Sequence, residues 1–260
     1  MEELDERQLG VDEVTSLALT GYGHFTTMRV EGGAIRGLGL HFARLARDCR
    51  TVFGTELNLH QVRQELCRAV DLTDDDVVIR ITVFDPELSL PHPAGPAAPR
   101  ILVTTRPAPA VPQGPMRVQP VRHLRQVAGV KHTGLFDSLH LRRAAQLDGF
   151  DDVLFHGDEL GISEGATWNV GFFDGRRPLW PQAEHLPGVT EALLTEAHGG
   201  FTSRAVTLNQ LPSMETAFAT NAAVGVRPIA AIGSVPFATD HPILSELRDR
   251  YAEIAAEQPH

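Results

Sequence analysis

Lys131 is the residue whose type most clearly suggests chemistry, because it is the only lysine in a chain with 22 arginines. A compositional bias that replaces lysine by arginine wherever only positive charge is needed accounts for this ratio. Lysine differs from arginine in that its amine can lose its proton and attack a carbonyl group. A single lysine that persists against this bias is therefore a candidate for a chemical role.

An acidic bend and the start of a helix offer groups that could act together with this lysine. Glu164 lies in a bend of small residues, 163–167, and the segment Pro-Gly-Val-Thr at 187–190 opens an expected helix. The free N–H groups of a helix N-terminus bind phosphate. A bend of this composition is usually no more than a turn. Each feature alone is therefore weak evidence for a functional site. The order of the motifs along the chain must decide whether they act together with Lys131.

Composition and charge exclude several classes of function. The formal net charge is -10, whereas a nucleic-acid-binding surface must be basic. Apolar runs are short and interrupted, which argues against a membrane-spanning helix, and the opening MEELDERQLG is acidic and polar, unlike a secretory peptide. We therefore expect a cytoplasmic protein, with Cys49 and Cys67 as reduced thiols. The twelve histidines form no H-x-x-x-H or H-x-H cluster, so no metal site is expected.

The spacing of apolar residues and turns predicts an α+β protein in two domains. Proline-rich stretches at 91–100 and 106–115 mark a loop and a linker. We therefore place a small N-terminal α/β domain at residues 1–114 and a larger domain at 115–260. The expected strands are a hairpin at 23–38, then 77–84, 100–106, 151–156 and 162–175 around a bend, and the expected helices are 40–54, 59–70 with Asn58 as its cap, 136–148, 187–198 and 242–256.

Five motifs follow one another in an order that resembles a known family. They are GYGHFTTMRVEGGAIRGLGLHFARL (21–45), Val130-Lys131 ahead of a helix that leads into GFDDVL (149–154), ISEGATWNVGFF (162–173), LPGVT (186–190) and FATNAAVGVRPI (218–229). In this order they resemble the class IV aminotransferases and the related aminodeoxychorismate lyases. No single motif is decisive, but the joint order covers most of the chain.

The resemblance implies the cofactor, the fold and the roles of the matched residues. Pyridoxal 5'-phosphate (PLP) would form a Schiff base with Lys131, and Glu164 would face the pyridine nitrogen and keep it protonated. The phosphate would be held by Arg44, Val189, Thr190 and the turn at Thr220 and Asn221. The implied architecture is PLP fold type IV, with a small N-terminal α/β domain, a larger C-terminal pseudo-barrel domain and the cofactor in the cleft between them. The family also implies a homodimer.

The leading functional hypothesis is amino-group transfer between an amino acid or amine and a 2-oxo acid, with Lys131 as general base and acid. The alternative is a lyase that releases pyruvate from an aminodeoxychorismate-like substrate, and a third reading is a PLP-binding protein without turnover. Thr26 and Thr27 stand where many aminotransferases have glutamate after the aromatic residue, which is similar to the lyases, as is Asn221 followed by alanine. The LPGVT and SEG motifs are typical of aminotransferases. Glu191 replaces a frequent arginine, and Gly134-Leu135-Phe136 lacks the tyrosine hydroxyl of a G-x-Y motif.

The substrate contacts are predicted from residue type. Phe25 and Thr27 lie in the first hairpin, and Arg80 on a strand could bind a carboxylate with two hydrogen bonds. Arg122 and Arg125 compete with Arg80 for this role. Two other residues each have a functional and a structural interpretation. Trp168 could line the pocket or pack in the core. His132 could shuttle protons, although adjacent residues of a strand point to opposite sides, so His132 would point away from Lys131. The expected ligands are therefore PLP and a small amino or oxo acid.

Overall fold

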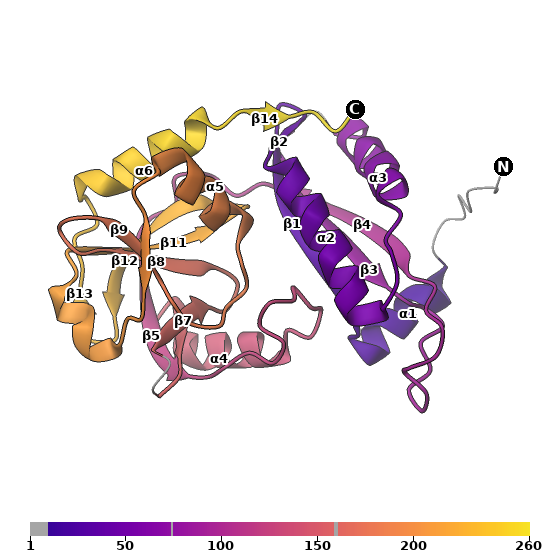
Figure 1. Ribbon diagram of the computed structural model, residues 1–260, viewed down its shortest axis with the longest axis horizontal. Helices are drawn as coiled ribbons and strands as arrows, with labels where there is room; N and C mark the ends of the chain where they lie inside the picture. Colours follow the sequence, from indigo (N-terminus) through magenta and orange to yellow (C-terminus); the bar gives the residue numbers. More distant parts are fainter. Residues whose placement is uncertain (1–9, 74, 159–160) are drawn as a thin grey trace.

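The computed structural model describes residues 10–73, 75–158 and 161–260, and it contains two β-sheets that lie side by side (Figure 1). The first sheet has the strand order β14-β2-β1-β3-β4. Its strands are β1 (Gly23–Glu31), β2 (Ala34–Arg36), β3 (Val77–Phe84), β4 (Arg100–Pro107) and β14 (Ala256–Glu257), and its helices are α1 (Val11–Thr20), α2 (Leu38–Phe53) and α3 (Leu59–Asp71). The mixture of helices and strands confirms the α+β prediction.

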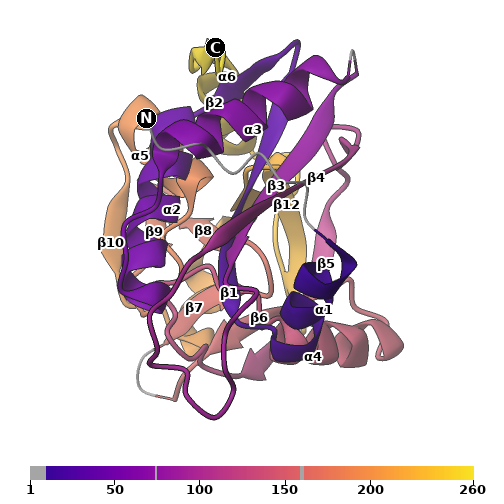
Figure 2. The same ribbon diagram turned by 90° about the vertical axis from the view of Figure 1, so that its right-hand side faces the viewer.

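Helices α2 and α3 cover one face of the first sheet, and Figure 2 shows them beside β1–β4 in a view turned by 90°. The predicted helix ends are confirmed, since Gly54 adopts φ +67° after α2 and the Asn58 side chain accepts a hydrogen bond from Gln61 N (3.2 Å) at the start of α3. The buried cluster between these helices and the sheet includes Met28, Val30, Leu45, Leu66, Ile79, Ile81 and Val83. Burial of this apolar surface holds the helices on the sheet.

The opposite face of the first sheet carries the polar side chains that matter for the site. Side chains alternate between the two faces of a strand, so that Met28 and Ile79 face the helices while Thr27 and Arg80 face away from them. Thr27 lies opposite Arg80 in the β1–β3 ladder, and Arg106 of β4 lies opposite Val78. Period-two alternation therefore places Phe25, Thr27, Arg80 and Arg106 on one surface.

The second sheet has the order β10-β9-β8-β11-β12-β5-β6-β7, with β13 paired to β12. Its strands are β5 (Met116–Arg122), β6 (Asp152–His156), β7 (Ile162–Gly165), β8 (Asn169–Phe173), β9 (Pro178–Pro181), β10 (Thr202–Arg204), β11 (Thr216–Asn221), β12 (Gly225–Ile232) and β13 (Val235–Pro236). The accompanying helices are α4 (Phe136–Leu147), α5 (Val189–His198), α6 (Pro242–Glu253) and the 3₁₀ helix η1 (Leu208–Ser213).

The second sheet curls into the expected pseudo-barrel. Strands from both ends of its order contribute to one core, which contains Met116, Val118, Leu154, Ile162, Val170, Phe172, Ala217, Ala219, Ile229 and Ile232. The edge strand β7 also returns to β8, where Gly165 N donates to Trp168 O at 2.8 Å. The curled sheet thus brings the acidic bend after β7 to the side that faces the first sheet.

Several elements of the fold were not among those predicted. One is β5, which begins directly after the proline-rich stretch at 106–115 and pairs in parallel with both β12 and β6. Pro120 lowers the strand propensity of this segment, although Met116 and Val118 are buried in the barrel core. Helix α1 and strand β14 were not predicted, and β14 returns the end of the chain to the first sheet.

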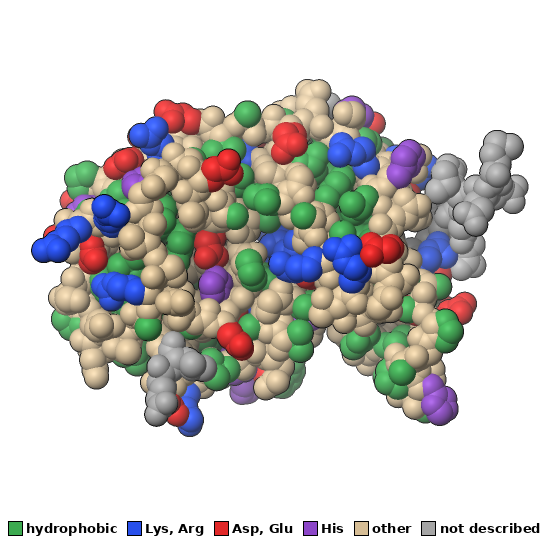
Figure 3. Space-filling model, viewed as in Figure 1, with side chains coloured by type: hydrophobic (Ala, Val, Ile, Leu, Met, Phe, Trp, Pro, Cys, Tyr) green, Lys and Arg blue, Asp and Glu red, His purple; other side chains and the backbone are tan. Residues whose placement is uncertain are grey.

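Three predictions from composition concern the surface and the chain ends. Cys49 and Cys67 are both free thiols. No helix among the described residues is long and apolar enough to cross a membrane. Residues 1–9, with most of the acidic N-terminal segment, lie outside the described residues. On the face shown in Figure 3, basic and acidic side chains of the described residues are interspersed over both halves.

Candidate active site

Lys131 is held at the edge of β1 by backbone hydrogen bonds on both sides. Strand β2 pairs only with the end of β1, at Val30 and Glu31, so the edge of β1 near Phe25 is open. The segment 131–133 occupies this edge, where Phe25 N donates to Lys131 O and Thr133 N donates to Gly23 O, each at 2.8 Å. On its other side, Lys131 N donates to Asp48 Oδ2 of α2 at 3.0 Å. Both backbone polar groups of the lysine are thus fixed by the first sheet and its helix.

The lysine side chain lines a cavity of about 250 Å³ between the two sheets. The structure brings nearly all of the sequence-predicted site residues to this cavity. Phe25, Thr27, Arg44, Arg80, Lys131, Glu164, Trp168, Val189, Thr190 and Asn221 all line it, and Thr220 lies buried directly before Asn221. Two unpredicted residues, Arg106 and Asn169, line the cavity as well.

One end of the cavity offers unpartnered groups that suit a phosphate. Arg44 is buried, and its Nη2 donates to Thr26 Oγ1 at 2.5 Å, but its Nε has no hydrogen-bond partner among the described residues. The buried hydroxyls of Thr190 and Thr220 also lack one there. Buried polar groups are normally hydrogen-bonded, so three such groups indicate a place for a polar ligand. The first N–H groups of α5, which starts at Val189, have no partner within the helix and add donors of the right kind.

The turn before α5 is fixed by a close contact that only glycine allows. Asn169 Nδ2 donates to Leu186 O at 2.8 Å, which ties β8 to the LPGVT segment. A Cβ atom at Gly188 would lie 2.1 Å from Asn169 Oδ1. The glycine of this motif therefore permits the approach that sets the position of Val189 and Thr190.

Glu164 is the acidic residue that lines the cavity. Its Oε1 accepts hydrogen bonds from Arg125 Nη1 (3.1 Å) and from Leu186 N (3.3 Å), whereas its Oε2 accepts none from the described residues. Arg125 also donates to Ala128 O and Val130 O, so it connects the acid to the loop before Lys131. An acceptor oxygen remains for a ring nitrogen.

The structure separates the two arginines that the sequence left in competition with Arg80. Arg125 is buried against Glu164 and lines the cavity. Arg122 instead forms an exposed ion pair with Asp158 and does not line the cavity. The prediction for Arg122 as a carboxylate ligand therefore has no geometric support.

The charge balance of the cavity favours anions and an unprotonated lysine. Glu164 is the one acid among its lining residues, against the cations Arg44, Arg80, Arg106, Arg125 and Lys131. Burial is the largest cause that lowers the pKa of Lys131, to about 7, and repulsion by Arg44 and Arg125 adds to it while Glu164 opposes it. Much of the amine is therefore neutral and nucleophilic near neutral pH.

The face of the first sheet supplies the remaining wall of the cavity. The Phe25 ring lies close to two cations, with Arg80 Cζ 3.7 Å and Lys131 Nζ 4.9 Å from its centroid. Arg80 Nε donates to Thr82 Oγ1 at 3.0 Å. Arg106 has no ion-pair partner among the described residues, so its guanidinium is available to an anion.

The doubled threonine of β1 divides between the two faces of the strand. Thr27 lines the cavity, whereas Thr26 is buried on the α2 side and contacts Arg44 and His41. Alternation along the strand explains the difference. Only Thr27 can therefore meet a substrate, and Thr26 supports Arg44.

Three of the residues considered as site candidates also make contacts that support the fold. Trp168 touches the cavity, but its Nε1 donates to Asp152 Oδ2 at 2.9 Å and its ring belongs to the barrel core. Asn221 Oδ1 accepts hydrogen bonds from the next turn, at Ala223 N and Val224 N (3.0 Å each), so its side chain shapes the turn. His132 lines the cavity while its backbone forms a bridge with His24.

Sequence reasoning missed Asp48, Arg106 and Asn169. One signal for Asp48 was present, because it lies four residues after Arg44 and so shares a face of the same helix. Arg106 has the strand period of a cavity-facing residue but stands next to the proline-rich stretch. Asn169 lies in the motif ISEGATWNVGFF, so that motif was the signal for it, although it was not named as a site residue.

Comparisons with known proteins agree with this geometry. The family model described as Amino-transferase class IV matches residues 23–232. No curated protein matches the chain at a significant level of sequence similarity.

Solved structures of related fold cover nearly the whole chain. A 4-amino-4-deoxychorismate lyase from Pseudomonas aeruginosa is 25% identical, with 94% of each chain covered and a TM-score of 0.77. A branched-chain aminotransferase from Thermoproteus uzoniensis is 20% identical, with 95% of this chain and 89% of that chain covered and a TM-score of 0.81. A hypothetical aminotransferase from Mycobacterium tuberculosis in its PLP-bound form is 18% identical, with 97% and 94% covered and a TM-score of 0.81.

Proposed function

The chain belongs to the class IV aminotransferase family, whose model matches residues 23–232, and from this premise we propose that it transfers an amino group between an amino acid or amine and a 2-oxo acid. Members of this family are PLP-dependent enzymes, and the residues present fit that cofactor. The observation that carries the proposal is the position of Lys131, a lysine with its pKa lowered to about 7, in a cationic cavity that also contains Glu164.

We assign the cofactor contacts from the unpartnered groups of the cavity. Arg44, Thr190, Thr220 and the first turn of α5 would hold the phosphate, and Glu164 Oε2 would face the ring nitrogen. When bound, PLP withdraws electrons from the bonds at the substrate's α-carbon. The turn formed by Asn221 would enclose the phosphate with its backbone.

The residues of this chain then have separate tasks. The Lys131 amine acts as general base when it removes the proton from the substrate's α-carbon. It acts as general acid when it returns the proton to the cofactor's C4′. Glu164 keeps a positive charge on the ring by accepting its N–H. Arg80 and Arg106 attract and orient the substrate carboxylates, and Phe25 keeps Arg80 in place by stacking.

The test is the half-reaction with single amino donors. The PLP-loaded enzyme is mixed with a panel of amino acids and amines, and conversion of the bound cofactor to its pyridoxamine form is followed by absorbance and mass spectrometry. Conversion, with release of the matching 2-oxo acid, supports transfer. If no donor in a broad panel converts the cofactor, the proposal of amino transfer fails.

A lyase that releases pyruvate from an aminodeoxychorismate-like substrate is the second candidate. It is favoured by the doubled threonine Thr26-Thr27, which stands where many aminotransferases have glutamate after the aromatic residue. It is also favoured by the pair Arg80 and Arg106, which suits a substrate with two carboxylates. Similarity to the Pseudomonas lyase adds support. Pyruvate release from 4-amino-4-deoxychorismate without any amino acceptor would distinguish this activity from transfer.

We further propose a homodimer. Apolar side chains project from α4, with Phe136 77%, Leu139 53% and Leu147 71% exposed, and exposed clusters of this kind are typical of protein interfaces. Light scattering during size exclusion should give twice the chain mass, and Leu139→Glu should shift the protein toward the monomer. A wild-type protein that elutes as a monomer at high concentration would refute the dimer.

The domain division and the cellular location are also proposals. Residues 1–114 and 115–260 would act as two domains with the cofactor between them, which limited proteolysis near residue 114 would test. A cytoplasmic location is supported by Cys49 and Cys67, which are both free. Fractionation of expressing cells would test it.

A further inference from the structure

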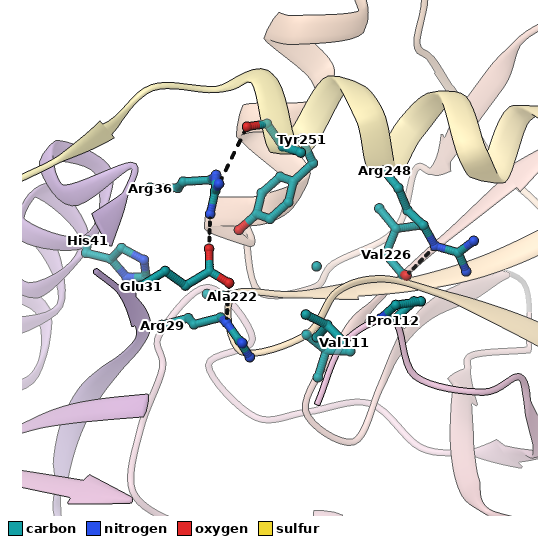
Figure 4. Close-up of a pocket in the computed structure, with 13 residues that line it drawn as sticks. Arg29, Glu31, Arg36, His41, Val111, Pro112, Ala222, Val226, Arg248 and Tyr251 are labelled. Atoms are coloured by element: carbon teal, nitrogen blue, oxygen red, sulfur yellow. Dashed lines mark hydrogen bonds and ion pairs between the residues drawn. The ribbon is translucent and has the colours of Figure 1, made fainter. Parts of the chain in front are cut away.

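A second cavity, of about 240 Å³, lies between the two sheets beneath α6 and apart from Lys131 (Figure 4). It shares only Ala222 with the lining of the lysine cavity. Its polar side comes from β1, β2, α2 and α6, and its apolar side comes from the segment before β5 and from β12. The residues that define it are Arg29, Glu31, Arg36, His41, Val111, Pro112, Val226, Arg248 and Tyr251.

A buried histidine with an unused donor lines this cavity. His41 has no exposed surface, and burial, together with Arg44 and Lys131, holds its pKa well below the usual value, so the ring is neutral. Arg44 donates to Thr26 Oγ1 (2.5 Å), which leaves the Thr26 hydroxyl hydrogen for His41 Nδ1 (2.8 Å). Nδ1 must therefore be the acceptor, and the ring proton is on Nε2. This Nε2–H has no partner among the described residues.

The charges around the cavity attract an anion. Glu31 accepts hydrogen bonds from both Arg29 (2.6 Å) and Arg36 (2.5 Å), and although burial works to raise its pKa, these two partners lower it, so it stays ionised. Arg36 Nε is buried without a partner among the described residues, and Arg248 Nε donates to Val226 O at 3.3 Å. Three arginines and one glutamate thus line the cavity, and Arg29 Nη2 also lies 3.6 Å from Asp76 Oδ2.

The other walls are apolar. Val111, Pro112, Ala222 and Val226 face the Tyr251 ring across the cavity, as Figure 4 shows. A purely inorganic anion would leave this surface without contacts, and a neutral apolar molecule would leave the His41 and Arg36 donors unpaired. The combination suits a ligand with one acidic end and an apolar body.

We propose that this second cavity binds a small monocarboxylic acid with an apolar body, whose carboxylate accepts hydrogen bonds from His41 Nε2 and Arg36 Nε. The binding also affects the lysine cavity through the chain His41–Thr26–Arg44, because Arg44 lines that cavity. A carboxylate on Nε2 strengthens the hydrogen bond at Nδ1 and fixes Arg44 in place. Only this second statement rests on the proposed role of Arg44 at the PLP phosphate.

Binding is tested on the PLP-loaded enzyme by calorimetric titration with benzoate and hexanoate. Benzamide serves as the neutral comparator and inorganic phosphate as the anion without an apolar body. Ala252 is exposed at the mouth of the cavity, so Ala252→Trp should block it, whereas Ala255→Trp adds the same side chain to an exposed position that does not line it. We expect saturable binding of one carboxylate per chain in the wild type and Ala255→Trp. In Ala252→Trp the added ring should keep the carboxylate from its donors, so affinity should fall by about tenfold or more, the scale of a lost charged hydrogen bond.

Three results would overturn the site. They are no saturable carboxylate binding in the wild type, equal binding in the two tryptophan variants, and tighter binding of phosphate or benzamide than of benzoate. Equal binding would place the carboxylate in the lysine cavity. None of these results depends on the half-reaction, so a failure of amino transfer is recognised separately.

Coupling is tested by the rate of PLP release with and without benzoate. We expect benzoate to slow release in the wild type, because Arg44, once fixed through His41 and Thr26, would hold the PLP phosphate more firmly. Thr26→Val removes the connecting hydroxyl, which also fixes the proton on His41 Nε2, so it should weaken benzoate binding and, at saturating benzoate, lose the effect on release. An equal effect in Thr26→Val would refute the proposed route.

Discussion

The backbone N–H of Lys131 donates a hydrogen bond to the Asp48 carboxylate at 3.0 Å, although 83 positions separate the two residues. Asp48 has no exposed surface and also accepts from the Arg47 guanidinium. The carboxylate therefore connects α2, which carries Arg44, to the segment that carries the lysine. One buried acid fixes the lysine relative to the proposed phosphate-binding arginine.

Loss of this acid should loosen the lysine segment. In Asp48→Ala, Lys131 N–H and Arg47 lose their acceptor, which should cost about 1–3 kcal/mol of unfolding free energy and weaken PLP binding. Asp48→Asn keeps an acceptor oxygen and should recover part of both. Denaturant unfolding and PLP titration measure the two effects. Glu56→Ala, which removes an exposed partner of Arg50, is the control and should change stability by no more than about 0.5 kcal/mol.

Chemical trapping should report on the lysine without ambiguity, because the chain has no other. Borohydride treatment of the PLP-loaded enzyme should add to the intact protein the mass of one PLP, less one water and plus two hydrogens, in the peptide that contains Lys131. Lys131→Arg keeps the charge but has no amine that can attack an aldehyde, so it should show neither the added mass nor the visible absorbance of the bound cofactor. Added mass in Lys131→Arg would contradict the assignment.

Capture of PLP by the cofactor-free enzyme should depend on pH through the lysine. Only the neutral amine attacks the aldehyde, and burial, followed by Arg44 and Arg125, lowers its pKa to about 7. The capture rate should therefore rise about tenfold per pH unit below this pKa and level off above it. Arg125→Gln removes a repelling charge and leaves Glu164 without its partner, so the profile should move to higher pH. Stopped-flow absorbance gives the profile, and a midpoint near the ordinary lysine value would refute the prediction.

Glu164 should affect catalysis more than cofactor binding. Glu164→Gln cannot hold a positive charge on the ring, so kcat of the half-reaction should fall by about 10²-fold or more, the usual scale for loss of an acid–base partner. PLP affinity should change far less, because the phosphate contacts remain. Arg125→Gln separates this effect from loss of the Arg125–Glu164 ion pair (3.1 Å). Equal losses of kcat in the two variants would assign the effect to the ion pair.

Arg80 should determine how well the enzyme accepts acidic substrates. Arg80→Gln removes a guanidinium that stacks on Phe25 and faces the cavity. KM for a 2-oxo acid with two carboxylates should rise by about tenfold or more, as expected for a lost charged hydrogen bond, and KM for an apolar 2-oxo acid should rise less. Arg143→Gln, at an exposed position of α4 outside the cavity, is the matched control. An equal rise for both substrates would argue against carboxylate binding by Arg80.

The sequence alone determined the features that depend on local chemistry and on order along the chain. A single lysine, the helix cap at Asn58, the glycine of LPGVT and the strand period that places Thr27 and Arg80 can each be read from neighbouring residues. The order of five motifs then indicated the family and its fold. These predictions succeed because helix caps, turns and alternation are short-range properties.

Only the tertiary structure decided which groups meet across the chain. It selected Arg125 over Arg122, showed that Asp48 holds Lys131, and joined His41 to Arg44 through Thr26 beside a second cavity. It also showed that β5, which follows a proline-rich stretch and was not predicted, is a strand of the barrel. Such contacts depend on packing between residues far apart in sequence, where long-range burial outweighs local propensity.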